Sequence, residues 1–483
     1  MQHLTVDVAI IGTGSAGMSA YRAARAHTDK VVVIESGVYG TTCARVGCMP
    51  SKLLIAAAEA AHAVDGAARF GVHTAAARID GRAVMQRVRA ERDRFTGFVV
   101  DAVEAWPDAH RLRGHARFLS PHELDVGGHT LVTAGRIVIA TGSSPSIPAG
   151  WRETLGERLV VNDDVFEWED LPASVAVVGP GVIGLELAMA LARLGVRVRL
   201  FGRGGRIGPL TDPVVAAKAR AVVQASLATS LDAEAIEPVR SGERVTVRWR
   251  EDGSRHEEEF DFLLAATGRK PNIRGLDLQR AGIEVDAYGM PHADRHTRRI
   301  GKSHVFLAGD ASDEAALLHE AADEGRIAGD NAGRYPDMVV RPRRAPLTVA
   351  FSDPQIAIAG ESHARLTQRG ADFAAGGASF DDQGRSRVMG RNLGQIQVYG
   401  ERGSGRFLGA EMIGPDAEHI GHLLSWSVQH GLTVQQMLDS PFYHPVVEEG
   451  LRTALRELKN ELGLAQPPLE DCLDCVAAPV LAS

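Results

Sequence analysis

The residues best suited to chemistry in this 483-residue chain are two cysteines, Cys43 and Cys48, which lie five positions apart. Two thiols at this spacing can close a ring if the backbone bends between them, and a small ring favours a reducible disulfide over a structural one. An alanine-rich helical pattern follows, so the N-terminus of a helix would lie near the thiols and favour the thiolate form. A pair of ordinary buried thiols is the alternative, which composition alone favours.

Composition limits the classes of protein to which the chain can belong. The apolar fraction of 45% and the charged fraction of 24% are typical of soluble globular proteins, and the length predicts about three domains. A net charge of −8 provides no basic surface for nucleic acid. Because the sequence shows neither a signal-peptide pattern nor an apolar run of membrane-spanning length, we expect a cytoplasmic protein without a membrane partner. In that compartment, paired cysteines are more often catalytic or metal-binding than structural.

The elements that must position the cysteines begin with a dinucleotide-binding pattern at the N-terminus. A buried parallel strand is predicted at residues 6–11 and runs into Gly12-x-Gly14-x-x-Gly17, a helix, and a second strand that ends on Glu35. The glycines let the backbone approach a pyrophosphate at the helix N-terminus, and Glu35 would accept hydrogen bonds from a ribose. Because all these features occur at the right spacing, the sequence predicts a dinucleotide site.

The same pattern recurs about 170 residues later. Strands predicted at residues 174–178 and 196–201 flank a helix that follows Gly179-x-Gly181-x-x-Gly184. Two independent nucleotide sites in one chain suggest one cofactor that is held permanently and another that exchanges.

The second site differs from the first at the position that selects the nucleotide. Arg203 and Arg206 follow its second strand, where the first unit has Glu35. Arginines can pair with a 2′-phosphate through charge-assisted hydrogen bonds, whereas a carboxylate would repel it. Solvated surface arginines are the alternative. The sequence therefore favours NADPH over NADH.

Further polar residues and turns follow other predicted strands. A strand is predicted at residues 136–143 and ends in a glycine turn, and residues 262–269 show a similar pattern. Residues 144–150 have the composition of a linker. A strand that begins at Val305 ends on Asp310, which could reach a polar cofactor chain.

The C-terminal third of the chain supplies a candidate acid–base. Strands and turns are predicted from residue 347 to residue 414 and helices from residue 415 to residue 461, which suggests an α+β domain without a nucleotide motif. His444 stands just before a predicted helix, with Glu449 five residues further on. Such a carboxylate can hold a histidine in one tautomer and keep it basic. Simple capping of the helix is an equally good alternative.

The last residues carry a second pair of thiols. Cys472 and Cys475 form a Cys-x-x-Cys pattern beyond two prolines, which predict the end of the last helix and a flexible tail.

Taken in order, these motifs resemble those of the flavoprotein disulfide reductases, the pyridine nucleotide-disulfide oxidoreductase family. That family includes glutathione reductase, mercuric reductase and dihydrolipoamide dehydrogenase, to which the chain is most similar. The resemblance covers nearly the whole chain and rests on Gly12-x-Gly14-x-x-Gly17, Cys43-x4-Cys48-x-Pro50-Ser-Lys52, Gly179-x-Gly181-x-x-Gly184-x-Glu186, Ala308-Gly-Asp310, and His444-Pro445 with Glu449.

The resemblance implies an α/β fold with two Rossmann-like dinucleotide-binding domains and a C-terminal α+β dimerisation domain. FAD would bind a domain made of residues 1–150 and 273–345, and NAD(P)H would bind residues 151–272. Residues 346–462 would form the interface of a homodimer, followed by the tail at residues 463–483.

The resemblance also assigns roles to single residues. Cys48 matches the flavin-proximal thiol and Cys43 the thiol that exchanges with substrate, while Lys52 and Glu186 match an ion pair beside the reactive flavin nitrogen. His444, oriented by Glu449, would be the acid–base for Cys43 of the other subunit. Contacts with the cofactors are expected at Asp310, Ala116, Thr141, Gly142 and Gly268, and no metal site is expected.

Departures from the family pattern leave the disulfide substrate open. Arg45 replaces an asparagine common in the family, and a fixed cation there is predicted to favour the thiolate of Cys43. We expect a lipoamide-like disulfide or dithiol substrate. Three alternatives are a soluble pyridine nucleotide transhydrogenase, against which Cys43 counts, a mercuric or thioredoxin reductase-like enzyme that relays electrons through Cys472 and Cys475, and a nucleotide-binding redox sensor.

Overall fold

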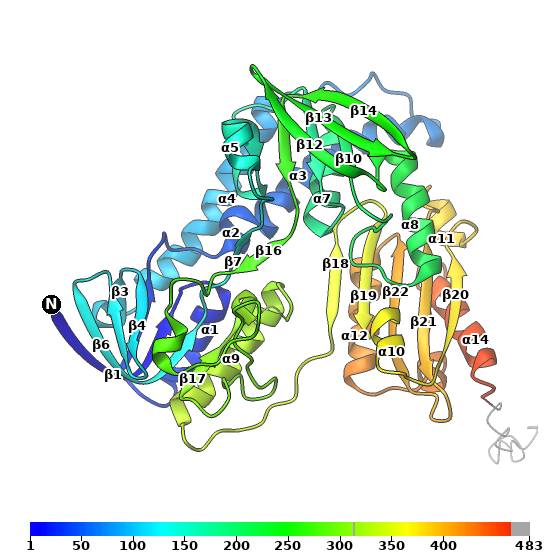
Figure 1. The fold of residues 1–483 in the computed structure, drawn as a ribbon. Helices are drawn as coiled ribbons and strands as arrows, with labels where there is room; N and C mark the ends of the chain where they lie inside the picture. The colour runs from blue at the N-terminus through cyan, green and yellow to red at the C-terminus, as the bar shows by residue number, and fades with distance from the viewer. Residues whose placement is uncertain (313, 465–483) are drawn as a thin grey trace, which may run out of the picture. The chain divides into compact units, whose positions relative to one another are not determined.

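A computed structural model describes residues 1–312 and 314–464 of the chain (Figure 1). These residues form two compact units. Unit 1 comprises Met1–Pro209, Arg220–Arg344 and Ala350–Asp353, and unit 2 comprises Leu210–Ala219, Ala345–Val349 and the chain from Pro354 onward. The predicted tail with Cys472 and Cys475 lies outside the described residues.

The first sheet of unit 1 is parallel around its central strand, β1 (Gln2–Ile11). β2 (Val31–Glu35) and β6 (Thr130–Ile139) pair with β1 in parallel, and β17 (Val305–Leu307) pairs in parallel with β6. Valines and isoleucines fill these strands because both faces of the sheet are covered. The strand predicted at residues 6–11 is confirmed and begins earlier, at Gln2. The sheet order is β3-β2-β1-β6-β5-β4, with β3 Arg111–Arg113, β4 Ala116–Ser120 and β5 Glu123–Val126.

Two helices cover one face of this sheet. Alanines of α1 (Ser15–Arg25) and α9 (Leu318–Arg334) pack in one core cluster with Val8 and Ile10 of β1. Small residues allow α1 and α9 to lie close together. The N-terminus of α1 lies at the carboxyl end of β1 because only three residues separate Ile11 from Ser15.

The second sheet of unit 1 carries the second glycine turn. β9 (Ser174–Val178) pairs in parallel with β10 (Arg197–Phe201) and β15 (Phe262–Ala265), and α7 (Val182–Arg193) follows the turn. The second strand–turn–helix–strand prediction is therefore confirmed. The strand order of this sheet is β11-β10-β9-β15-β8, with β11 Ala228–Ser230 and β8 Leu159–Val160 at its edges. A separate antiparallel sheet contains β12 Glu234–Ser241, β13 Arg244–Glu251 and β14 Ser254–Phe260.

The prediction that residues 144–150 are only a linker needs correction. β7 (Ser143–Pro145) pairs in antiparallel fashion with β16 (Arg269–Pro271). Long-range pairing with a strand that follows the second sheet overrides the local turn composition. The remaining helices of unit 1 are α2 Thr42–Val46, α3 Cys48–Gly66, α4 Gly81–Glu104, α5 Trp151–Leu155 and α6 Asn162–Val165.

Unit 2 is an antiparallel sheet with helices packed on it, as the α+β prediction requires. The order is β18-β19-β22-β21-β20, and every residue of β22 (Phe407–Gly414) is buried. Residues of α12 (Ala417–Gln429) and α14 (Glu449–Glu461) share one core cluster with the sheet. The other elements are α8 Pro213–Ser226, which begins in this unit, and β18 Leu347–Ala350, β19 Gln355–Gly360, α10 His363–Gln368, β20 Phe373–Ser379, α11 Gly384–Val388, β21 Gln395–Glu401 and α13 Val434–Leu438.

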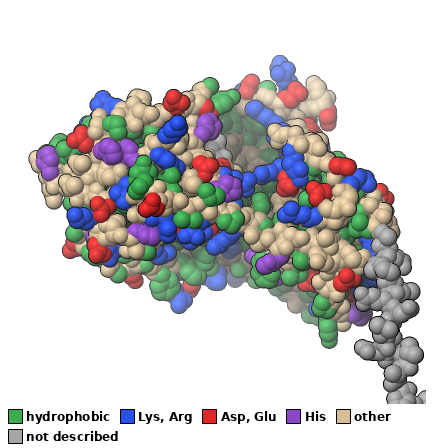
Figure 2. All heavy atoms as spheres, turned by 90° about the horizontal axis from the view of Figure 1, so that it is seen from below, with side chains coloured by type: hydrophobic (Ala, Val, Ile, Leu, Met, Phe, Trp, Pro, Cys, Tyr) green, Lys and Arg blue, Asp and Glu red, His purple; other side chains and the backbone are tan. Residues whose placement is uncertain are grey.

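Basic and acidic side chains are intermingled on the face of the molecule drawn in Figure 2. Ion pairs such as Arg248–Glu257 and Arg369–Glu361 are common on the surface. None of the helices within residues 1–312 and 314–464 combines the length and the apolar character that crossing a bilayer requires.

Candidate active site

Cys43 and Cys48 lie on two consecutive helices rather than in a simple loop. Cys43 belongs to α2, and Cys48 is the first residue of α3. Gly47 joins the helices, and a Cβ atom at this position would lie 3.0 Å from the carbonyl oxygen of Thr42. The sharp bend at Gly47 brings the two sulfur atoms together, and the N-terminus of α3 lies at Cys48, as predicted.

The two cysteines are free thiols with different acidities. Cys43 is half-buried and Cys48 is exposed. A hydrogen bond from the Cys43 thiol, assisted by the charge of Lys52, lowers the pKa of Cys48 to about 7, although the protein around the sulfur atom excludes some water and opposes this change. The same hydrogen bond and burial raise the pKa of Cys43. Cys48 is therefore the thiolate and Cys43 the thiol of the reduced pair.

Arg45, which the sequence predicts to favour the thiolate of Cys43, is not among the groups that act most strongly on the pKa of this thiol. The cation that acts on Cys43 is Lys52, and its effect is smaller than the opposing effects of Cys48 and burial. The charge of Arg45 acts instead on Asp163, where it opposes the increase in pKa that burial causes. The aliphatic part of the Arg45 side chain lies against Gly40, which sequence neighbourhood alone does not reveal.

Lys52 and Glu186 form the predicted ion pair. Nζ of Lys52, on α3, lies 2.8 Å and 2.7 Å from Oε1 and Oε2 of Glu186, on α7. Glu186 is buried, with a relative exposure of 4%. The backbone N–H of Phe351 also donates to Oε1 of Glu186 at 3.0 Å, and the Phe351 ring centroid lies 4.5 Å from Nζ of Lys52. Both glutamate oxygens therefore have partners, and Lys52 is held next to the thiols.

Phe351 is a residue that sequence reasoning missed. It lies in a short irregular segment directly after β18, and no motif or spacing marks it. Only the tertiary structure brings this residue to a pair formed by α3 and α7.

The first glycine turn has the shape needed to receive a phosphate group. A Cβ atom at Gly17 would lie 1.9 Å from the carbonyl oxygen of Gly12, so glycine is required where helix and strand meet. A Cβ atom at Gly14 would meet nothing within 4 Å, which leaves this side of the turn open. No side chain caps the N-terminus of α1. The turn therefore offers free backbone N–H groups to an anion.

Glu35 lies at the end of β2 beside this turn. Its Oε2 accepts hydrogen bonds from the backbone N–H of Thr13 at 2.9 Å and from Oγ1 of Thr13 at 2.7 Å, and its Oε1 accepts one from Gly37. These donors hold the carboxylate at the turn. Thr13 was missed because threonine at a variable position of the motif carries no signal.

Other predicted cofactor residues surround the end of β6. Oγ of Ser143 donates to Oδ2 of Asp310 at 2.8 Å, and Nε of Arg269 donates to Oγ of Ser143 at 2.8 Å. The buried Oγ1 of Thr141 has no hydrogen-bond partner within the described part of the chain. Gly142, with φ at +68°, makes the turn between Thr141 and Ser143. The orphaned hydroxyl and the aligned carboxylate fit a polar cofactor chain.

Ala116 and Gly268, the other two residues at which cofactor contacts are expected, lie in different surroundings. Ala116 is buried in β4, where it packs in the core cluster of the first sheet. Gly268 lies between β15 and β16 with φ at +104°.

The second glycine turn repeats the geometry of the first. A Cβ atom at Gly184 would lie 1.8 Å from the carbonyl oxygen of Gly179, and one at Gly181 would meet nothing within 4 Å. Arg203 and Arg206, beyond the end of β10, are exposed, and neither has an ion-pair partner among the residues described. Their guanidinium groups are therefore available to a phosphate.

His444 and Glu449 form the predicted pair in unit 2. Nδ1 of His444 lies 3.0 Å from Oε2 of Glu449, which is the first residue of α14. Burial opposes ionisation of Glu449, but hydrogen bonds from His444 and the backbone of Val446 lower its pKa. Because an ionised carboxylate only accepts, Nδ1 carries the proton and Nε2 of the exposed histidine is free to act as a base.

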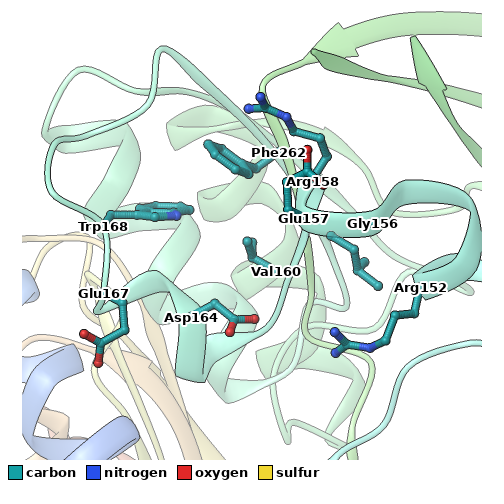
Figure 3. A pocket seen from close by; sticks show the side chains of 10 residues that line it. Arg152, Gly156, Glu157, Arg158, Val160, Asp164, Glu167, Trp168 and Phe262 are labelled. Atoms are coloured by element: carbon teal, nitrogen blue, oxygen red, sulfur yellow. The ribbon is translucent and has the colours of Figure 1, made fainter. Parts of the chain in front are cut away.

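An open cavity of about 650 Å³ lies elsewhere in unit 1, and its lining contains none of the predicted site residues. Figure 3 shows Trp168 and Phe262 on its walls with charged side chains around them. Glu157 and Glu167, two of these charged residues, already pair with arginines. In the described ranges, no group of three His, Cys, Asp or Glu residues is placed to hold a metal ion.

Comparison with known families identifies two matches that together cover most of the chain. Residues 6–325 match the pyridine nucleotide-disulphide oxidoreductase family, and residues 347–455 match the pyridine nucleotide-disulphide oxidoreductase dimerisation domain. The predicted fold class is confirmed.

Individual relatives have several different activities. The chain is 30% identical to mycothione reductase from Mycobacterium tuberculosis, over 94% of this chain and all of the relative. It is 30% identical to dihydrolipoyl dehydrogenase from Thermus scotoductus, over 95% of this chain and 98% of the relative. It is 29% identical to mercuric reductase from Acidithiobacillus ferrooxidans, over 95% of this chain and 83% of the relative.

Solved structures share the fold at lower identity. The HOCl-induced flavoprotein disulfide reductase RclA from Escherichia coli aligns with a TM-score of 0.77 at 22% identity, over 95% of this chain and all of that one. LpdA from Mycobacterium tuberculosis aligns with a TM-score of 0.78 at 23% identity, with the same coverage.

Proposed function

The chain belongs to the pyridine nucleotide-disulphide oxidoreductase family, and we propose that it is an NAD(P)H:disulfide oxidoreductase of the dihydrolipoyl dehydrogenase type. One observation carries this proposal. Within a single unit, the thiol–thiolate pair Cys43–Cys48 lies beside the Lys52–Glu186 ion pair, and that unit also contains two open glycine turns. Family members use FAD and NAD(P)H, and the two turns fit two dinucleotides.

FAD would be held by the turn that contains Gly14, by Glu35 and by Asp310, and NAD(P)H by the turn that contains Gly181. When bound, FAD would supply a two-electron carrier between the nicotinamide and the cysteine sulfurs. Lys52, held by Glu186, keeps a positive charge beside Cys48 and so favours its thiolate.

The cysteines would then reduce a substrate by thiol–disulfide exchange. The Cys43 sulfur, after losing its proton to Nε2 of His444, attacks the substrate disulfide, and the first substrate sulfur leaves with a proton from the histidine. The Cys48 thiolate then attacks the Cys43 sulfur, which closes the Cys43–Cys48 disulfide and releases the second substrate sulfur as a thiolate that takes a proton from solvent. We propose that this histidine comes from the partner subunit of a homodimer, since the family's dimerisation domain contains His444.

The proposed substrates are lipoamide-like disulfides, with NADPH preferred to NADH. Exposed Arg203 and Arg206 support the preference, because each can make charge-assisted hydrogen bonds with a 2′-phosphate. Steady-state rates with both nucleotides, on lipoamide and on glutathione disulfide, test the proposal. Replacing both arginines by glutamine should raise KM for NADPH about tenfold and leave KM for NADH nearly unchanged. Equal increases for the two nucleotides would contradict the preference.

A relay through the second thiol pair is a separate proposal that rests on the sequence alone. If Cys472 and Cys475 carry electrons onward, replacing both by serine should abolish reduction of a large substrate such as a protein disulfide while the rate on lipoamide persists. Unchanged rates on every substrate would exclude the relay.

Anaerobic reduction separates the proposed function from a transhydrogenase or a redox sensor. Adding two electrons to the flavin-loaded protein should produce a long-wavelength absorption from the Cys48 thiolate next to the flavin. Its absence would favour one of those alternatives.

A further inference from the structure

A short segment after β18 is anchored on helix α7 of unit 1. Ala350–Asp353 belongs to unit 1, whereas the chain on both sides of it belongs to unit 2. Oδ2 of Asp353 lies 2.6 Å from Nη2 of Arg193, and the backbone N–H of Asp353 donates to Sδ of Met189. Two independent contacts therefore attach Asp353 to α7.

The attachment points lie on the face of α7 that carries Glu186. Met189 and Arg193 follow Glu186 by three and seven residues, which is the spacing of one helical face. The gap between this face, Phe351 and Asp353 has a volume of about 10 Å³. This is at the lower limit for a single water molecule, so the segment is closely seated on the helix.

The same segment supplies two contacts to the ion pair beside the thiols. The N–H of Phe351 donates to Oε1 of Glu186, and the Phe351 ring faces the ammonium group of Lys52. Glu186 is buried and needs every donor that it has, because an ionised carboxylate is costly to bury with incomplete hydrogen bonding. The ring of Phe351 restricts where the flexible Lys52 side chain can place its charge.

We propose that Arg193 and Asp353 are positioning residues: their ion pair holds Phe351 against Lys52 and Glu186, and so fixes the ammonium group beside Cys48. This inference rests on the proposed function, in which Lys52 acts next to the thiols and the flavin. Cys43 acts on the pKa of Cys48 through a hydrogen bond, and Lys52 and Glu186 act through their charges; neither Arg193 nor Asp353 is among these groups. Their influence on Cys48 therefore passes through the position of Lys52.

Two further titratable groups, both on α3, lie near the Arg193–Asp353 pair: Glu59 lines the same small gap, and the charges of both partners act on His62. His62, on α3, has a pKa that burial lowers and that the charge of Arg193 lowers further, while Asp353 opposes the change. His62 is therefore neutral near pH 7 and does not compete with Arg193 for the carboxylate of Asp353.

The test measures the pH dependence of alkylation at Cys48. Reduced, flavin-free protein is treated with iodoacetamide, and labelling of the Cys48 peptide is followed by mass spectrometry. Asp353→Asn and Arg193→Gln should each slow labelling at pH 7 about two- to threefold and move its midpoint to higher pH, because Lys52 is no longer fixed. Phe351→Leu should act in the same direction, and Glu257→Gln, which breaks a surface ion pair with Arg248, should leave the profile unchanged.

The two charge-removing variants discriminate between positioning and direct electrostatics. Removing a negative charge at Asp353 would by itself favour the Cys48 thiolate, and removing a positive charge at Arg193 would disfavour it. Shifts in the same direction support positioning, whereas opposite shifts, or none, overturn it. If either variant does not fold, Phe351→Leu and Arg193→Lys decide, and the lysine variant should keep the wild-type profile.

Flavin binding by the wild-type protein distinguishes a failure of the proposed function from a failure of the positioning role. If the protein neither binds FAD nor oxidises NAD(P)H, the proposed function fails, but parallel shifts in the flavin-free variants still support the positioning role. If the wild-type protein is an active flavoprotein and the Cys48 profile does not respond, only the positioning role fails.

Discussion

At the scale of single residues, the proposed chemistry depends on the charges around two sulfur atoms. Lys52 is the cation that favours the thiolate of Cys48, while Glu186 opposes it and holds Lys52 in place. The hydrogen bond between the two thiols lets one sulfur be charged while the other keeps its proton. Reactivity should therefore differ between Cys43 and Cys48, although they lie only five positions apart.

Replacing Lys52 by methionine tests this balance. The pKa of Cys48 should rise from about 7 toward the ordinary thiol value, because the charge that stabilises the thiolate is removed. At pH 7 the thiolate fraction, and with it the rate of alkylation at Cys48 in the reduced flavin-free protein, should fall about tenfold. Lys218→Met is the matched control, since Lys218 pairs with Asp381 in unit 2. An unchanged rate in Lys52→Met would contradict the assignment.

His444 offers a second test at this scale. Glu449→Gln removes the charged acceptor that keeps the proton of His444 on Nδ1, so Nε2 is no longer held as the acceptor nitrogen. Disulfide reduction should fall about 10- to 100-fold, as is usual when the partner of a functional histidine is removed. Electron transfer from NAD(P)H to ferricyanide should be unaffected, because this reaction needs no thiol exchange. Equal losses in both assays would point to a folding defect instead.

At the scale of elements, each nucleotide site is a strand, a glycine turn and a helix N-terminus. The three glycines of each turn have different structural roles. Gly12 and Gly17 are required by contacts inside the protein, whereas the space beside Gly14 is open. Substitutions at Gly12 and Gly17 should therefore affect the stability of the fold, whereas a substitution at Gly14 should affect mainly ligand binding.

Two alanine substitutions in the first turn should therefore have different effects. Gly14→Ala should change the free energy of unfolding of the flavin-free protein by no more than about 0.5 kcal/mol, because its Cβ atom meets nothing. It should nevertheless reduce FAD content, since the methyl group stands where a phosphate would approach. Gly17→Ala should lower both stability and FAD content. Thermal denaturation and flavin absorbance measure the two effects, and a normal FAD content in Gly14→Ala would place the cofactor elsewhere.

At the scale of the whole molecule, the proposal requires two chains. The disulfide helices lie in unit 1 and the histidine in unit 2, and the match to the dimerisation domain suggests a homodimer. Under the proposed function, each active site would use residues of both subunits. A dimer would then be needed for catalysis as well as for stability.

Mixed dimers test this arrangement. Subunits with Cys43→Ser and subunits with His444→Gln should each be inactive alone in disulfide reduction. When the two are co-expressed with different tags, half of the dimers are mixed, and each mixed dimer has one intact site. About a quarter of the wild-type activity should therefore return. If none returns although mixed dimers are purified, the thiols and the histidine of one active site do not come from different subunits.

Much of the site could be predicted from the sequence because its parts are local. Each glycine turn, with its strand and helix, lies within about 30 residues, and His444 and Glu449 lie within one turn of a helix start. Backbone geometry and helix spacing dictate such arrangements whatever surrounds them. The order of the motifs along the chain then indicates the family and its fold.

Only the tertiary structure decided which distant side chains meet. Arg45 is two residues from Cys43 in sequence, yet Lys52, nine residues away, is the cation that acts most strongly on the pKa of Cys43. Phe351 and Asp353 carry no local signal, and their contacts with α7 join residues that lie more than 150 positions apart in the chain. The sequence determined the backbone turns that could bind nucleotides, whereas long-range packing determined the electrostatic surroundings of the thiols, because charges act through distance in space and not along the chain.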